Sequence, residues 1–284
     1  MSRVKNLVTS EWLIKNHDSS DLKICDATYF LATHKRDAKA EYLANHISGA
    51  IRFDIDSIKN PASDLPHMLP TAQQFEAHMQ ELGINNNDIV VVYDNSPFLS
   101  AARAWWLLRM FGHERVFVLD GGLKRFTAVG GKTESGEGQT FPKSNFKASD
   151  PIDTNVILFD ELREQVLSGE TEQILDARSY PRFIGEEAEP REGLRGGHIP
   201  GSCNLPITSL LNLDTGEIVT DEQIKKRVAD ADIDLDKPII TTCGSGVTAT
   251  GIALALCLIG VTGIKIYDGS WAEWGASSAP IATD

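Results

Sequence analysis

The sequence has no surplus of basic residues. Its 27 lysines and arginines are outnumbered by 40 aspartates and glutamates, which gives a formal net charge of −13. A surface with this charge balance cannot neutralise phosphates, so the composition argues against nucleic acid or an anionic membrane as a partner. It does not exclude a small anionic substrate, because a few arginines in one pocket are sufficient to bind one.

Cysteine is scarce, and its spacing excludes two common frameworks. The four cysteines form no C-x-x-C pair and no Cys/His cluster with the spacing of a zinc site. The sequence therefore predicts neither a disulfide scaffold nor a structural metal. Free thiols are typical of a reducing compartment, and we expect the cytoplasm. The cysteines are Cys25, Cys203, Cys243 and Cys257.

Long apolar runs are also missing. The longest, residues 251–261, is too short to span a bilayer, and the first residues lack the apolar core of a signal peptide. We therefore expect a soluble protein without a membrane partner. The 42% of hydrophobic residues nevertheless supply enough apolar side chains for a proper core.

The chain contains an internal repeat. Short motifs of the first half recur in the same order roughly 150 residues later. The pairs are Asp26-Ala27-Thr28 with Asp176-Ala177-Arg178, His46-Ile47-Ser48-Gly49 with His198-Ile199-Pro200-Gly201, residues 90–94 with 239–243, and Asp120-Gly121-Gly122 with Asp268-Gly269-Ser270. We infer two copies of one domain, at residues 1–130 and 154–284, joined by a linker at 131–153.

Each copy alternates predicted strands with predicted helices. We expect strands at 22–26, 89–93 and 116–119 in the first copy and at 174–176, 239–242 and 264–267 in the second. Helices are expected after Thr9 or Ser10, after Thr71 with Gln74 in a capping box, and over 101–111 and 247–259. The linker shows neither period. This alternation is typical of an α/β protein with parallel sheets.

One loop of the second copy suits nucleophilic chemistry. Residues 243–248, Cys-Gly-Ser-Gly-Val-Thr, lie between a predicted strand and a predicted helix. The glycines allow a tight turn that points successive amides at one spot, and the helix adds its positive N-terminal end. We therefore expect Cys243 to favour the reactive thiolate and the other cysteines to be packing residues. A phosphatase loop would need an arginine at Ala249, so phosphate chemistry is not expected.

With other motifs, this loop resembles the rhodanese superfamily, in particular its tandem-domain 3-mercaptopyruvate sulfurtransferases. The resemblance covers nearly the whole chain and includes residues 53–56, 67–70, 189–191, 197–201 and 267–271. It implies two tandem rhodanese-like domains, each a parallel sheet flanked by helices. The N-terminal copy would be catalytically silent, because Asp94 stands at the position aligned with Cys243.

The resemblance also implies a reaction and its site. Sulfur would pass from 3-mercaptopyruvate to Cys243 as a persulfide, and then to a thiol such as thioredoxin or to cyanide, without a metal or an organic cofactor. Asp56, His67 and Ser245 would form a relay that returns a proton to the pyruvate enolate. The implied substrate-binding residues are Arg182, Arg191, Gly244, Gly246, Val247 and Thr248.

Several alternatives stay open on the sequence. The related thiosulfate sulfurtransferases carry basic side chains in this loop, so the uncharged Gly244 and Ser245 favour mercaptopyruvate while thiosulfate remains the alternative donor. A non-catalytic tandem module would be expected to lose Cys243. Asp56 and His67 could instead order their own loop, and Arg103 could serve domain packing.

Overall fold

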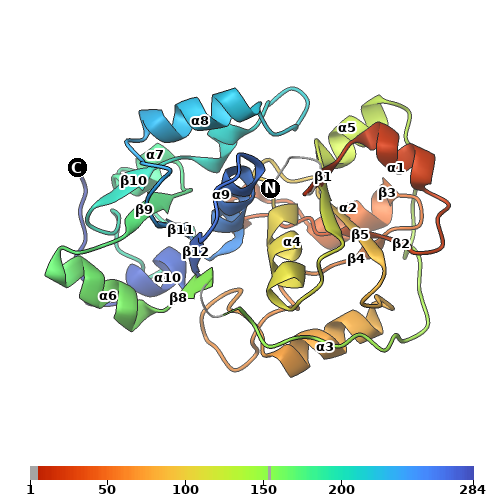
Figure 1. The fold of residues 1–284 in the computed structure, drawn as a ribbon, viewed down its shortest axis with the longest axis horizontal. Helices are drawn as coiled ribbons and strands as arrows, with labels where there is room; N and C mark the ends of the chain where they lie inside the picture. The colour runs from red at the N-terminus through yellow and green to blue at the C-terminus, as the bar shows by residue number, and fades with distance from the viewer. Residues whose placement is uncertain (1–5, 153–154) are drawn as a thin grey trace.

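Two five-stranded parallel sheets, one in each half of the chain, form the framework of the structure (Figure 1). This computed structural model describes residues 6–152 and 155–284. The first sheet has the order β1-β6-β5-β2-β4, from Leu7–Val8, Val116–Leu119, Ile89–Tyr93, Leu22–Asp26 and Ile51–Arg52. The second has the order β10-β9-β11-β12-β8, from Ser202–Asn204, Gln173–Asp176, Ile239–Thr242, Lys265–Tyr267 and Val156–Ile157. Read from β8, the second order matches the first, which confirms the duplicated parallel α/β fold.

Helices flank both sheets. The first half holds α1 to α5, at Ser10–Asn16, Ala38–Ala44, Ala72–Glu81, Ala101–Met110 and Gly122–Ala128. The second holds α6 to α10, at Phe159–Ser168, Tyr180–Phe183, Asp221–Asp230, Val247–Leu258 and Ser270–Trp274. Short 3-10 turns are η2 at Ala32–His34 and η4 at Ile207–Leu210. Within residues 6–152 and 155–284, no helix has the length and apolar character needed to cross a membrane.

The predicted helix caps are present. The Thr9 hydroxyl accepts the Trp12 amide, so Thr9 rather than Ser10 caps α1. Thr71 and Gln74 exchange hydrogen bonds as a capping box at the start of α3. The linker differs from the expectation, because β7 (Thr133–Glu134) pairs antiparallel with β3 (His46–Ile47). A strand of two residues has no periodicity by which the sequence could have revealed it.

The interface between the halves is built around two central helices. α4 and α9 lie against each other in the middle of the molecule (Figure 1). Nearly every residue of both helices is buried, and α9 is apolar on all sides. Because β5 precedes α4 and β11 precedes α9, the loop that follows each of these strands lies at the interface.

Each half also covers the other half's loop. The Leu69 amide, from the segment before α3, donates to Asp268 Oδ2 over 2.6 Å. In the opposite direction, the Ile218 amide donates to Asp120 Oδ1 over 2.8 Å. Equivalent segments of the two domains therefore contact each other's loops, and residues of both domains surround Cys243.

Candidate active site

Cys243 lies in a tight turn between β11 and α9. It is 2% exposed and follows the last strand residue directly. Gly246 ends the turn with φ of +77°, and a Cβ there would stand 2.9 Å from the Asp268 carbonyl oxygen. Only glycine fits this conformation without strain. The Cys-x-x-Gly spacing is therefore what brings the start of α9 next to the sulfur.

Ser270, the first residue of α10, contacts this loop and was missed by the sequence interpretation. Its hydroxyl accepts the amides of Cys243 and Gly246 over 3.2 and 3.0 Å, and lies 3.9 Å from the Cys243 sulfur. Ser270 has φ of +51°, a conformation that is costly for a residue with a side chain. The change from Gly122 in the first copy to Ser270 in the second was the available signal. Ser270 braces the turn beneath the cysteine.

Three of the predicted site residues form one hydrogen-bonded series. His67 Nδ1 lies 3.1 Å from Ser245 Oγ and 3.3 Å from the Ser245 carbonyl oxygen. On the other side of the ring, His67 Nε2 lies 2.9 Å from Asp56 Oδ1. Ser245 belongs to the second domain, while Asp56 and His67 belong to the first. The series therefore crosses the interface, as the sequence led us to expect.

The electrostatics of the series suit a neutral imidazole beside a carboxylate. Burial of His67 lowers its pKa, and this outweighs the opposing effect of Asp56. The hydrogen bond from His67 lowers the pKa of Asp56, whose side chain is 63% exposed. With Asp56 ionised, Nε2 donates to it and Nδ1 is left to accept the Ser245 hydroxyl hydrogen.

Arg182 lies directly beside the cysteine loop. Its Nη2 donates to Glu189 Oε2 over 2.5 Å, and Glu189 also accepts from Arg178. A Cβ on Gly244 would stand 3.0 Å from the same Nη2 atom. Glycine at this position therefore lets the guanidinium approach the loop closely, while Glu189 fixes its orientation.

Arg191 comes from the same segment and lies beside Tyr29. It is half-buried. Burial is the main cause that raises the pKa of Tyr29, and the positive charge of Arg191, which hydrogen-bonds Tyr29, opposes it. The Tyr29 ring meets the His67 ring edge to face, with centroids 4.9 Å apart. Arg191 therefore lies close to the Asp56–His67–Ser245 series.

A cavity of about 420 Å³ opens beside the cysteine loop, and Arg191 is not among the residues that line it. Cys243, Ser245 and Arg182 line it. Of the other predicted binding residues, Gly244, Val247 and Thr248 line it as well, whereas the Gly246 amide is already engaged with the Ser270 hydroxyl. No group of three or more His, Cys, Asp or Glu side chains in the described ranges is arranged to hold a metal ion.

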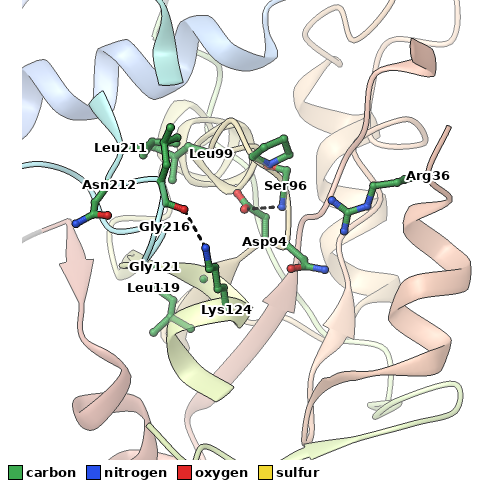
Figure 2. Close-up of a pocket in the computed structure, with 14 residues that line it drawn as sticks. Arg36, Asp94, Ser96, Leu99, Leu119, Gly121, Lys124, Leu211, Asn212 and Gly216 are labelled. Atoms are coloured by element: carbon green, nitrogen blue, oxygen red, sulfur yellow. Dashed lines mark hydrogen bonds between the residues drawn. The ribbon is translucent and has the colours of Figure 1, made fainter. Parts of the chain in front are cut away.

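The first domain has a second cavity at the equivalent loop. It measures about 250 Å³ and is lined from both domains, by Asp94, Ser96 and Lys124 on one side and by Asn212 on the other. Figure 2 shows the Asp94 carboxylate hydrogen-bonded to Ser96, and Lys124 reaching the facing segment. Asp94 thus occupies the place that the nucleophile has in the second copy.

Comparisons with known proteins agree with this architecture. The model of the rhodanese-like domain matches residues 9–129 and 158–277. The chain is 41% identical to 3-mercaptopyruvate sulfurtransferase of Escherichia coli K12, over 95% of this chain and 94% of that protein. It is 40% identical to thiosulfate/3-mercaptopyruvate sulfurtransferase 1, mitochondrial, of Arabidopsis thaliana, over 96% and 77%. The crystal structure of SseA from Escherichia coli, a 3-mercaptopyruvate sulfotransferase, superposes with a TM-score of 0.84 at 38% identity, over 93% and 98%.

A fold built from two such domains, with a lone cysteine in the second copy's loop, defines a tandem rhodanese-domain protein. The chain belongs to the rhodanese family. Within it, the sequence is similar over nearly its whole length to the 3-mercaptopyruvate sulfurtransferases. The resemblance inferred from the motifs is thereby confirmed.

Proposed function

We propose that the protein is a 3-mercaptopyruvate sulfurtransferase, which takes sulfur onto Cys243 as a persulfide and passes it to a thiol or to cyanide. The observation that carries the proposal is the series Asp56–His67–Ser245 beside Cys243. Transfer from 3-mercaptopyruvate leaves an enolate that must gain a proton, whereas thiosulfate leaves sulfite, which needs none. A proton-handling group next to the nucleophile therefore favours mercaptopyruvate.

The donor would be held by its carboxylate and ketone. Arg182 lines the cavity, and the part of its planar guanidinium that Glu189 does not engage would bind the donor carboxylate, for which a guanidinium is better suited than an ammonium group. Arg191, which comes from the same segment, would take the remaining oxygen. The amides of Gly244, Val247 and Thr248, at the start of α9, would stabilise the anionic persulfide.

The first half-reaction moves one sulfur and one proton. The Cys243 thiolate attacks the donor sulfur, an S–S bond forms, the C–S bond breaks, and its electron pair becomes the enolate. The proton of the donor thiol passes to the enolate carbon through the Ser245 hydroxyl, which His67 polarises, and this gives pyruvate. Asp56 holds the imidazole in the required tautomer.

The second half-reaction regenerates the cysteine. An acceptor thiolate attacks the outer sulfur, and Cys243 leaves as a thiolate. A dithiol such as thioredoxin suits this step, because its second thiol can expel hydrogen sulfide and close a disulfide. Cyanide would give thiocyanate. The cycle needs no metal or organic cofactor and requires a reduced thiol, for which the cytoplasm is the expected compartment.

Thiosulfate is the second candidate donor, and one contact favours it. Arg182 supplies a positive charge beside Gly244, where an uncharged loop would otherwise bind a dianion poorly. The name of the Arabidopsis thaliana relative joins both donors. The test is steady-state transfer to cyanide from each donor. A higher kcat/KM for thiosulfate would overturn the assignment of mercaptopyruvate.

The relay has its own test. Ser245→Ala should lower kcat with 3-mercaptopyruvate about 100-fold, because the enolate loses its proton donor. The same variant should keep its activity with thiosulfate. Unchanged turnover of mercaptopyruvate would remove Ser245 from the mechanism, and equal losses with both donors would assign it a structural role. Mass spectrometry of donor-treated protein, with persulfide expected on Cys243, excludes a purely non-catalytic module.

A further inference from the structure

Arg103 of α4 belongs to the N-terminal domain, but it contacts the turn that follows Cys243 in the C-terminal domain. Its Nη1 donates to Asp268 Oδ1 over 2.6 Å and to the Gly246 carbonyl oxygen over 3.3 Å. Its Nη2 donates to the carbonyl oxygen of His67. The side chains of Arg103 and Asp268 are 1% and 2% exposed, so the ion pair is excluded from water.

Asp268 completes the arrangement from the second domain. Its second carboxylate oxygen accepts the Leu69 amide over 2.6 Å. His67 is therefore held on two sides, through its own carbonyl by Arg103 and through the amide two residues later by Asp268. His67 also has φ of +58°, a backbone conformation that persists only when its surroundings enforce it. One ion pair thus fixes both the backbone of His67 and the end of the cysteine turn.

A buried ion pair at this place is not explained by stability. Removing two charges from water costs as much as, or more than, their attraction returns, and well-packed apolar residues often replace such pairs without loss. The partner helix α9 packs against α4 with no charged residue along residues 247–258. An apolar contact at position 103 would therefore suit the interface, and the charge points to a requirement for geometry.

We propose that the Arg103–Asp268 pair is a positioning element of the active site, which holds His67 and the turn from Cys243 to Gly246 in one register across the domain interface. The inference rests on the proposed function, because the pair acts through His67 and Ser245 and touches no substrate. In this arrangement the silent domain supplies both the imidazole of the site and the arginine that sets its position.

The charge of Arg103 provides a readout that a purely structural role would not move. Four titratable groups face His67: Asp56, Tyr29, Arg191 and Arg103. Burial is the main cause of the low pKa of His67, and the positive charges of Arg103 and Arg191 lower it further, while Asp56 raises it. Removing the charge at position 103 should therefore raise the pKa of His67. Because the relay needs neutral imidazole, the acid limb of the rate profile should move to higher pH.

The experiment compares Arg103→Met with Arg103→Lys in the full chain. We expect Arg103→Met to lower kcat for transfer from 3-mercaptopyruvate to cyanide about 100-fold, as loss of alignment does, with little change in KM. The acid limb of its pH–rate profile should move to higher pH. Arg103→Lys keeps the charge but not the fork. It should therefore lower kcat while leaving the limb in place.

Arg125→Met is the matched control. Arg125 also reaches from the first domain to a carboxylate of the second, Glu217, over 3.4 Å, but at a partly exposed place away from the cysteine turn. This variant should keep the wild-type kcat and pH profile. Unfolding midpoints of all three variants show whether each is folded. If Arg103→Met does not fold, the kcat of Arg103→Lys decides whether the pair positions the active site.

Two results would overturn the inference. A folded Arg103→Met or Arg103→Lys enzyme with wild-type kcat would show that the pair positions nothing. A loss of activity in Arg103→Met without a shift of the acid limb would leave the pair a structural role only. Failure of the proposed function is distinguishable, because the wild-type chain itself would then show no transfer from 3-mercaptopyruvate.

Discussion

The two cavities of this molecule follow the same position in two copies of one fold, yet only one has a nucleophile. In the second copy Cys243 directly follows β11, and α9 begins after a turn of three further residues. In the first copy Asp94 directly follows β5, and α4 begins only at Ala101. The Asp94 carboxylate accepts the amides of Ser96 and Ala101 over 3.1 and 2.6 Å. The silent loop is therefore longer and contains its own anion.

The two copies also differ at the residue that follows Asp120-Gly121 in the first and Asp268-Gly269 in the second. Gly122 and Ser270 both adopt a left-handed backbone, with φ of +53° and +51°. The amide of the next residue donates over 2.9 Å to a carbonyl oxygen in both copies: Leu123 donates to Asp94, and Trp271 donates to Cys243. A Cβ on Gly122 would meet the Asp94 carbonyl oxygen at 2.2 Å, so no side chain fits there. In the second copy, the equivalent position has space for the Ser270 side chain.

The comparison indicates how one copy became a partner of the other. The loop after β5 satisfies the amides of Ser96, Ser100 and Ala101 internally, and it faces a cavity without a nucleophile. Its domain instead contributes His67 and Asp56, which reach across to the live loop. The duplicated fold thus places equivalent loops on both sides of one interface, and a change at a few positions assigns chemistry to one side.

The strongest test of this asymmetry moves the nucleophile. Cys243→Ser should lower sulfur transfer more than about 10³-fold, because no persulfide can form. Adding Asp94→Cys to that variant should restore nothing, since the silent loop lacks the facing histidine–serine pair. The measurement is thiocyanate formation from 3-mercaptopyruvate and cyanide. Recovered activity in the double variant would mean that the cysteine alone distinguishes the copies.

A smaller effect is expected when the live loop is made more like the silent one. Ser270→Gly removes the acceptor for the amides of Cys243 and Gly246, so the turn loses its brace and kcat should fall roughly 10- to 100-fold. The free energy of unfolding should change by only about 1 kcal/mol, because glycine relieves the left-handed backbone while the two amides lose a partner. Steady-state kinetics and denaturant unfolding measure the two quantities. An unaltered kcat would contradict the bracing role.

Much of the fold could be predicted from the sequence. The paired motifs of the two halves gave the duplication, and the β-branched runs at 89–93 and 239–242 are the central strands β5 and β11. The duplication, the strands and the turn at Cys243 are local in sequence or recur in it, so a single chain is sufficient to read them. The meeting of His67 with Ser245, 178 positions apart, was implied only by the family resemblance.

Other features depend on contacts that no local pattern records. Ser270 lies 27 residues beyond Cys243, and only the folded turn places its hydroxyl under the sulfur. The pairing of Arg103 with Asp268 joins two domains. Glu189 falls in an acidic, loop-like segment that reads as solvated, yet it orients two arginines. The sequence shows the residue types, but their partners are decided by tertiary packing.

The carboxylate of the live site predicts a shift of the pH profile. Asp56→Ala should lower kcat with 3-mercaptopyruvate about 10-fold, a modest loss because Asp56 is largely exposed and water can take its place. Since Asp56 raises the pKa of His67, its removal should lower that pKa and move the acid limb to lower pH. Profiles of kcat and of kcat/KM against pH measure the two effects. A limb that moves upward would contradict the assignment of His67 as the titrating group.

The carboxylate of the silent site should affect stability and leave catalysis alone. Burial raises the pKa of Asp94 to about 6, above its value in the unfolded chain. The folded state therefore binds more protons between about pH 4 and pH 6, so ionisation of Asp94 makes the protein less stable as pH rises through that window. Asp94→Asn lacks this titration. The variant should therefore become more stable relative to wild type as pH rises: the difference between their free energies of unfolding should grow by roughly 2–3 kcal/mol between pH 4 and pH 7.

Denaturant unfolding of both proteins at several pH values measures this difference, and subtraction removes the titration of the other carboxylates. Sulfur transfer by Asp94→Asn should stay within about two-fold of wild type, because Asp94 lies at the loop that carries no nucleophile. A pH-independent difference in stability would show that Asp94 does not titrate in this range. A large loss of activity would show instead that the silent loop supports the live one through the interface, and the two copies would then be less independent than their cavities suggest.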